Sequence, residues 1–178
     1  LTEADPLHRR WLVVFRPSPL AAAPDLGELA GSGPLTPDHV IRTKPRPLVI
    51  TPEAEVAAAV QSYVREYEAY FAGCAGDHPY VKLDPLPRVI WVAGVGLFTV
   101  GATAREASIA ADIAVHTLTL KQRAAGTGPF VPLSDEQLFE MEYWALEQKK
   151  LGRGSEPVLA RRVALVTGGA GAIGVGVA

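Results

Sequence analysis

A glycine-rich turn between a short apolar run and a helix start is the feature that most constrains this chain. Residues 163–166 read Val-Ala-Leu-Val, which is typical of a parallel strand buried on both faces. A Gly-x-Gly-x-x-Gly pattern follows. Strand, glycine turn and helix N-terminus together bind a dinucleotide diphosphate, because glycines admit the phosphates and helix N–H groups face them. We therefore predict a cofactor-binding loop at Gly168, Gly169, Gly171 and Gly174.

The same segment lacks the rest of a dinucleotide-binding unit. A βαβ unit needs about 30 residues or more, and its ribose-binding acid lies about 20 residues past the glycines. The printed sequence stops at Ala178. We expect 163–178 to be a truncated Rossmann start that binds no cofactor alone, because one strand and one loop form no crevice. The alternative is a flexible tail rich in glycine and alanine.

Composition limits the classes of partner. The 178 residues are 48% hydrophobic and 20% charged, as in ordinary globular proteins, and a net charge of −2 provides no basic field for nucleic acid. Cys74 is the only cysteine, which excludes a disulfide framework. No apolar run approaches the ~20 residues that span a bilayer, and the acidic N-terminus is unlike a signal peptide. We expect a cytoplasmic protein with no nucleic-acid or membrane partner.

Strand and helix signals alternate, which predicts an α/β (mixed α+β) class. The predicted strands are 11–15, 47–50, 88–92 and 97–100. The predicted helices are a short turn at 24–30 and longer helices at 51–70, 103–123 and 134–150.

Local signals fix the starts of the longer helices. Thr51 is expected as an N-cap before Pro52, and the other two helices open on capping boxes. The helix at 134–150 is expected to turn Trp144 inward. A tyrosine stripe on 51–70 and an alanine face on 103–123 are expected to pack.

The most polar cluster lies between residues 36 and 46. Histidine suits proton transfer near neutral pH, and arginine and lysine suit phosphate or carboxylate groups. We therefore predict a substrate-binding cluster for a small anion at His39, Arg42 and Lys44. The alternative is a solvated loop in which Asp38 caps or pairs locally.

Familiar catalytic and metal motifs are absent from the sequence. No tyrosine has a lysine four residues later, and Tyr143 has Glu147 there instead. There is no His-x-His pair, no His-Glu-x-x-His and no Gly-x-Ser-x-Gly. We therefore predict no catalytic residue and no metal ligand in this chain.

Several stretches resemble bifunctional proteins that join a class II aldolase to a short-chain dehydrogenase, typified by the rhamnulose-phosphate aldolase/alcohol dehydrogenase type. The glycine turn resembles the first βα turn of the dehydrogenases. The stretches that resemble the fusion are Thr36–Lys44, Pro87–Phe98 with Gly101–Ala107, and Asp135–Gln148. The last is the most specific, because Met-Glu-Tyr-Trp is rich in rare residues.

The resemblance implies an arrangement of domains. It implies an N-terminal strand and proline-rich segment (1–34), an aldolase-like α/β domain (35–151), a linker (152–162) and the dehydrogenase start (163–178). The sheet and helices of the second part would be a remnant of the class II aldolase fold.

It also implies a function for a larger parent protein. The parent would cleave a ketose phosphate of deoxy-sugar catabolism, then oxidise or reduce the aldehyde product with NAD(P). Zinc would belong to an aldolase part missing here, and this fragment is expected to be inactive, without a cofactor, and homo-oligomeric.

Two alternatives stay open. The chain could be a non-catalytic oligomerisation or interaction domain that uses the tyrosine stripe and the alanine face. It could also be a small enzyme that uses the loop at Asp38 and His39, in which case His39→Ala would abolish a measured turnover.

Overall fold

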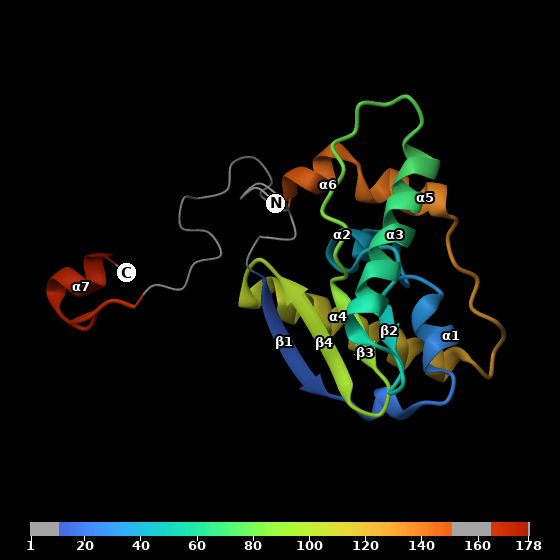
Figure 1. Cartoon of the computed structure of the whole chain (residues 1–178), viewed down its shortest axis with the longest axis horizontal. Helices are drawn as coiled ribbons and strands as arrows, with labels where there is room; N and C mark the ends of the chain where they lie inside the picture. Colours follow the sequence, from blue (N-terminus) through green and yellow to red (C-terminus); the bar gives the residue numbers. More distant parts are fainter. Residues whose placement is uncertain (1–10, 151–164, 178) are drawn as a thin grey trace.

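The computed structural model describes residues 11–150 and 165–177. Four strands form one sheet in the order β1-β4-β3-β2 (Figure 1). The strands are β1 (Leu12–Pro17), β2 (Leu48–Ile50), β3 (Val89–Val92) and β4 (Gly96–Gly101). β4 is antiparallel to β1 and β3, whereas β2 is parallel to β3. The mixed α/β class predicted from the sequence is confirmed.

Helices and 3-10 turns link and cover these strands. They are η2 (Pro19–Ala22), α1 (Leu26–Gly31), η3 (Pro37–His39), α2 (Val40–Thr43), α3 (Val56–Ala75), α4 (Ala104–Ala124), α5 (Asp135–Glu142), α6 (Ala145–Lys150) and α7 (Ala172–Val177). Within the described residues, no helix is long and apolar enough to cross a membrane.

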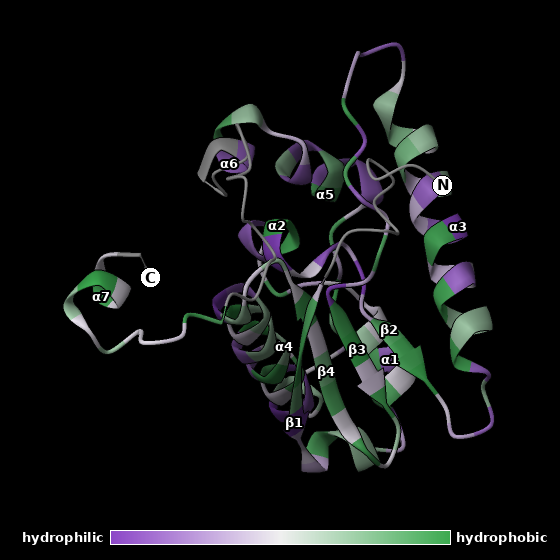
Figure 2. Ribbon diagram, turned by 60° about the vertical axis from the view of Figure 1, so that its left-hand side comes forward, coloured by the Kyte–Doolittle hydropathy of each residue, from purple (hydrophilic) through white to green (hydrophobic). Residues whose placement is uncertain are grey.

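α4 packs along one face of the sheet, and small side chains allow the close approach. Its alanine face is buried against Trp91 and Leu97, both nearly inaccessible to solvent. The buried alanines are Ala107, Ala110, Ala111 and Ala114. Thr99 donates a hydrogen bond to the Ala107 carbonyl oxygen at 2.7 Å, which fixes the helix on β4. Figure 2 shows apolar strands between this helix and α3.

α3 covers the β2 side of the opposite face. Tyr63, Tyr67 and Tyr70 are buried against Leu48, Ile50, Phe139 of α5 and Tyr143, the C-cap of α5, in a second core cluster. The two helix faces that the sequence offered for an oligomer interface are therefore both buried within this chain. That part of the interaction hypothesis is wrong, because each face has an intramolecular partner.

β1 joins the sheet by pairing with β4 over its whole length, from Leu12 opposite Gly101 to Pro17 opposite Gly96. The strand predicted at 11–15 and the strands predicted at 88–92 and 97–100 therefore share one sheet. The linker expected at 152–162 lies outside the described residues.

Two helix predictions need correction. α3 starts at Val56, not at Thr51, because the Glu55 carboxylate caps it by accepting hydrogen bonds from the Ala57 and Ala58 amides. Thr51 instead closes a turn with Ala54.

The helix predicted over 134–150 breaks at its centre into α5 and α6. The capping box of Ser134 and Gln137 is present as predicted. Because the helix ends at Glu142, Trp144 leaves the inward face and is 49% exposed.

Candidate functional site

The predicted polar cluster folds as η3 and α2, two short turns that end at Lys44. His39 is half-buried, and its Nδ1 has no hydrogen-bond partner among the described residues. Burial lowers the pKa of His39, nearby His116 lowers it further, and Asp38 opposes both. Arg42 lies in the last turn of α2 and is half-buried.

Lys44 is not beside His39 and Arg42 on a solvent-facing surface. Its side chain is 4% exposed, and its Nζ lies 3.2 Å from Glu142 Oε1 and 3.8 Å from the centre of the Tyr67 ring. Burial lowers the pKa of Lys44 to about 8, although the Glu142 carboxylate acts in the opposite direction. The structure thus places the third predicted substrate ligand inside the protein.

The backbone of Lys44 has a conformation that glycine usually adopts. Its φ of 68° and ψ of 168° place it in a region that is essentially restricted to glycine, and Lys44 alone among the described non-glycine residues has positive φ. Such a conformation costs about 1–3 kcal/mol and persists only where surrounding contacts enforce it. Those contacts include the bond from the Lys44 amide to the Val40 carbonyl and the ion pair of its side chain.

Glu142 is the centre of a buried hydrogen-bond network. Its Oε1 accepts from Tyr67 Oη at 2.9 Å as well as from Lys44, and Tyr67 Oη lies 2.8 Å from Tyr143 Oη. Tyr143 Oη in turn accepts from the Leu83 amide. Burial and the Glu142 charge raise the pKa of Tyr67, which therefore stays a hydrogen-bond donor.

We call Lys44, Glu142, Tyr67 and Tyr143 the buried cluster. It joins α2, α3 and α5, and all four side chains are less than a tenth exposed. A group without solvent access cannot bind a substrate from solution, so this arrangement is organised for holding three elements together.

The sequence analysis missed Glu142, although a signal existed. The capping box at Ser134 fixes the register of α5, and Glu142 lies four residues after the inward-facing Leu138. Residues four apart share a helix face. This spacing alone indicates that Glu142 lies in the core. A carboxylate buried in a core needs a cationic partner, which would have drawn attention to Glu142.

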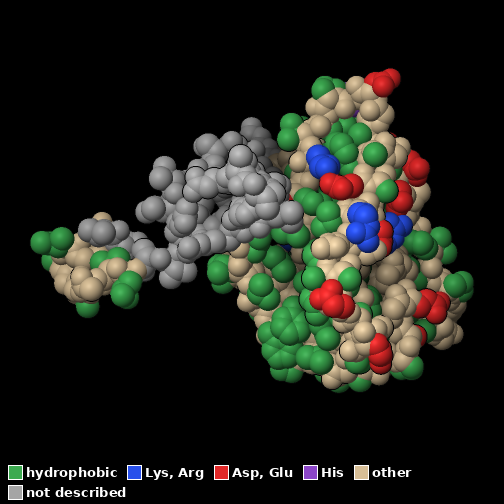
Figure 3. Space-filling view, in the orientation of Figure 1, with side chains coloured by type: hydrophobic (Ala, Val, Ile, Leu, Met, Phe, Trp, Pro, Cys, Tyr) green, Lys and Arg blue, Asp and Glu red, His purple; other side chains and the backbone are tan. Residues whose placement is uncertain are grey.

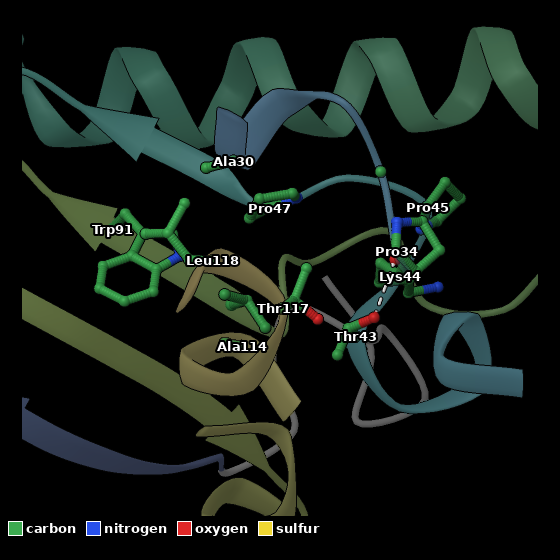
Figure 4. Close-up of a pocket in the computed structure, with 12 residues that line it drawn as sticks. Ala30, Pro34, Thr43, Lys44, Pro45, Pro47, Trp91, Ala114, Thr117 and Leu118 are labelled. Carbon is green, nitrogen blue, oxygen red and sulfur yellow. Dashed lines mark hydrogen bonds between the residues drawn. The ribbon is translucent and has the colours of Figure 1, made fainter. Parts of the chain in front are cut away.

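Two hollows lie near the predicted cluster. The first is a cavity of about 30 Å³, the size of a water molecule, between α4, β3 and the segment around Thr43 (Figure 4). Its walls include Trp91, Ala114 and Leu118, so it is mainly apolar and too small for a sugar phosphate.

The second hollow, of about 440 Å³, is more open. Its walls are Pro37, Leu133, Gln137, Glu140, Met141 and Trp144. It lies beside η3, but none of the three predicted substrate ligands lines it.

The glycine loop forms a compact turn followed by a helix. Gly168 has φ of 70°, Gly171 N donates to the Gly168 carbonyl at 2.9 Å, and α7 follows. A Cβ at Gly174 would overlap the Gly168 carbonyl, so this close approach requires glycine. Val163 and Ala164 lie outside the described residues, and Leu165 and Val166 are not in a strand.

The zinc chemistry implied by the resemblance finds no matching donor set. Among the described residues, no three or more histidine, cysteine, aspartate or glutamate side chains gather closely enough to hold a metal ion. His39 and His116 interact electrostatically, but the part of the chain that the structure describes brings no third such ligand to them. We therefore derive no step through zinc in this chain.

Comparison with known proteins gives the family. A model described as "Aldolase class II, second domain" matches residues 9–151. The chain is 32% identical over 163 residues to the "Uncharacterized oxidoreductase YuxG" of Bacillus subtilis (strain 168), a match covering 85% of this chain and 23% of that protein. The chain thus spans about a quarter of the length of this relative. No solved structure matches this chain significantly. The matched residues include the entire four-stranded sheet and helices α1–α5. The chain therefore belongs to the family of class II aldolase second domains.

Proposed function

We propose that this chain is the second aldolase-family domain of a protein that joins a sugar-phosphate aldolase to an NAD(P)-dependent short-chain dehydrogenase. In this proposal the domain catalyses neither reaction. The parent protein would cleave a ketose phosphate of deoxy-sugar (rhamnose-type) catabolism to dihydroxyacetone phosphate and a lactaldehyde-type aldehyde. Its dehydrogenase part would then oxidise or reduce that aldehyde in the cytoplasm.

The observation that supports the proposal is the order of two features on one chain. An aldolase-family domain at 9–151 is followed by a turn in which Gly168 has positive φ and Gly174 packs against its carbonyl. Both properties suit the start of a dinucleotide site, where a tight turn and a helix N-terminus receive the diphosphate. A relative of which this chain covers about a quarter is named as an oxidoreductase, which supports a dehydrogenase part in the parent protein.

The buried cluster gives the domain a structural rather than a catalytic part in this proposal. Lys44 and Glu142 carry the charges that aldol chemistry could use, but they are 4% and 1% exposed and neutralise each other. NAD(P), when bound to the completed protein, would supply hydride transfer. Here the glycine loop would contribute backbone N–H groups to the diphosphate and nothing to the reacting carbon.

The test compares two proteins in the same two assays. One is the product of the complete encoding reading frame, which we expect to continue past Ala178, and the other is the 178-residue chain. Aldol cleavage of a 1-phosphorylated ketose is measured for both, together with aldehyde-dependent reduction of NAD(P)⁺ and aldehyde-dependent oxidation of NAD(P)H. We expect activity only for the longer product. Turnover by the 178-residue chain, or a reading frame that stops at Ala178, would contradict the proposal.

A further inference from the structure

The sheet has an apolar area that no described helix covers. α4 packs on one face and α3 covers the β2 side of the other, which leaves β1 and β4 open on that second face (Figure 1). The register places Phe15 beside Phe98 and Val13 beside Val100 there. Val13 is 60% exposed and Phe15 46%. Figure 3 shows hydrophobic side chains gathered over these two strands.

The same strand is also the edge of the sheet. β1 pairs with β4 on one side only, and no other described residue forms a ladder with its outer side. A six-residue edge strand presents unpaired N–H and C=O groups, and proteins usually protect such edges with lysine, proline or bulges. Arg16 and Pro17 lie at the end of this edge, whereas Leu12, Val13, Val14 and Phe15 include no charged residue and no proline. A partner that supplies a strand would therefore satisfy backbone groups and cover apolar side chains at one place.

Charge restricts the chemistry of that partner. β4 has no charged residue, and the charged residue of β1 is Arg16, which points to the α4 side and pairs with Asp112 at 2.5 Å. The open face formed by Val13, Phe15, Phe98 and Val100 is thus uncharged. Nucleic acid and charged peptides find no complementary group on it, whereas an apolar strand does.

A second copy of this chain supplies such a strand, and we propose that the protein forms a two-fold dimer through antiparallel pairing of the two β1 edges. Directly opposed residues in an antiparallel pair point to the same side of the sheet. The open faces of the two copies are therefore continuous only if the two-fold axis passes through a residue and not between two residues. A two-fold axis through Val14 pairs Val13 of one copy with Phe15 of the other on the open face. Each copy brings Arg16 with its own Asp112, so no unpaired charge enters the seam. The interface is isologous, as closed dimers require.

The first experiment measures molar mass in solution, and it does not depend on the proposed function because no activity is needed. Sedimentation equilibrium of the 178-residue chain is expected to give twice the 18.9 kDa chain mass. Val13→Lys combined with Phe15→Lys is expected to halve that mass, because the lysines at residues 13 and 15 of the two copies would face each other across the seam as two pairs of like charges. Val81→Lys, at a valine that is 85% exposed elsewhere, is the matched control and should stay dimeric.

A charge-swap experiment tests both whether a second copy of this chain is the partner at this edge and whether the two β1 strands pair in the proposed register. A double-lysine variant at residues 13 and 15 and a double-glutamate variant at the same residues should each be monomeric. Mixed together they should form a heterodimer, because each lysine then faces a glutamate. Circular dichroism of each variant confirms that it is folded.

Two results would overturn the dimer. One is a wild-type monomer at about 100 μM, the concentration range of weak association. Slow exchange of the β1 amides in such a monomer would show that another segment of this chain covers the edge. The other is a dimer whose mass is unchanged by the double-lysine substitution.

Discussion

Lys44 and Glu142 meet in the interior of the protein, with Lys44 Nζ 3.2 Å from Glu142 Oε1 and both side chains less than 5% exposed. Lys44 comes from the end of α2 and Glu142 from the end of α5, so the pair joins segments far apart in sequence. The lysine also has a backbone conformation that suits glycine. Two costs thus coincide at Lys44, one from backbone strain and one from removing a charge from water.

Breaking this ion pair should cost more than replacing it. Lys44→Met leaves a buried carboxylate without a counter-charge and should lower the free energy of unfolding by about 3–5 kcal/mol. Lys44→Met combined with Glu142→Leu removes both charges and should recover most of that loss. Urea unfolding of wild type, both single variants and the double variant measures the coupling. Additive losses in the double variant would contradict an interaction between these side chains.

Backbone strain at Lys44 should appear as a difference between glycine and alanine. Both Lys44→Gly and Lys44→Ala remove the ammonium group, so they share the loss of the ion pair. Glycine adopts φ near 68° freely, so its variant should be more stable than the alanine variant by about 1–3 kcal/mol. At a residue with ordinary φ, alanine would be the more stable of the two. Equal stability, or a more stable alanine variant, would show that Lys44 is unstrained.

The buried lysines should make stability rise with pH in the weakly alkaline range. Burial lowers the pKa of Lys44 to about 8 from 10.5, and Lys121, bonded to three oxygen atoms, shifts likewise. Above pH 8 the unfolded chain therefore binds more protons than the folded protein, and the free energy of unfolding increases with pH. The contribution of Lys44 is fully present only above 10.5 and is lost as pH falls through 8.

The measurement compares wild type with Lys44→Met by urea unfolding from pH 8 to about 9.5. Tyrosines with raised pKa give the opposite slope near pH 10, and the comparison cancels their effect. We expect a steeper rise for wild type. Parallel curves would mean that Lys44 titrates equally in the folded and unfolded states.

The hydroxyl of Tyr67 should contribute more than that of Tyr63. Tyr67 Oη donates to a buried carboxylate at 2.9 Å, whereas Tyr63 Oη donates to the neutral Arg46 carbonyl at 2.8 Å. Tyr67→Phe should therefore cost about 1.5–3 kcal/mol and the matched control Tyr63→Phe about 1 kcal/mol. Thermal and urea unfolding measure both losses of stability. A larger loss for Tyr63→Phe than for Tyr67→Phe would show that Tyr67 does not donate to the Glu142 carboxylate.

Local signals in the sequence predicted most of the elements but not their tertiary roles. Apolar runs predicted all four strands of the sheet, and Thr103 caps α4 as its spacing with Glu106 indicated. The start of α3 was wrong because Glu55, which is not a common N-cap residue, caps it through its carboxylate. The break after Glu142 was missed because Tyr143 and Trp144 fit the helical period, although the Tyr143 backbone, with φ of −101° and ψ of 6°, is no longer helical.

The site was harder to predict, because its residues are brought together by the fold. Lys44 and Glu142 are 98 positions apart, and no spacing rule links them. The substrate-binding role predicted for His39, Arg42 and Lys44 stays a prediction. The burial of Lys44 was not predicted, because a positive φ at a lysine has no signal in the sequence. The glycine pattern did predict a tight turn, since Gly168 and Gly174 are needed by local backbone geometry alone.

Calorimetric titration of the 178-residue chain with NAD⁺ and with NADP⁺ tests most directly whether this aldolase-family domain carries only the opening of a dinucleotide site. The proposed account predicts no heat of binding for either nucleotide, because a diphosphate needs a crevice between strands as well as a glycine turn. The product of the complete reading frame, titrated in parallel, should bind at least one of them. Micromolar binding by the 178-residue chain, lost on Gly174→Ala, would contradict the account.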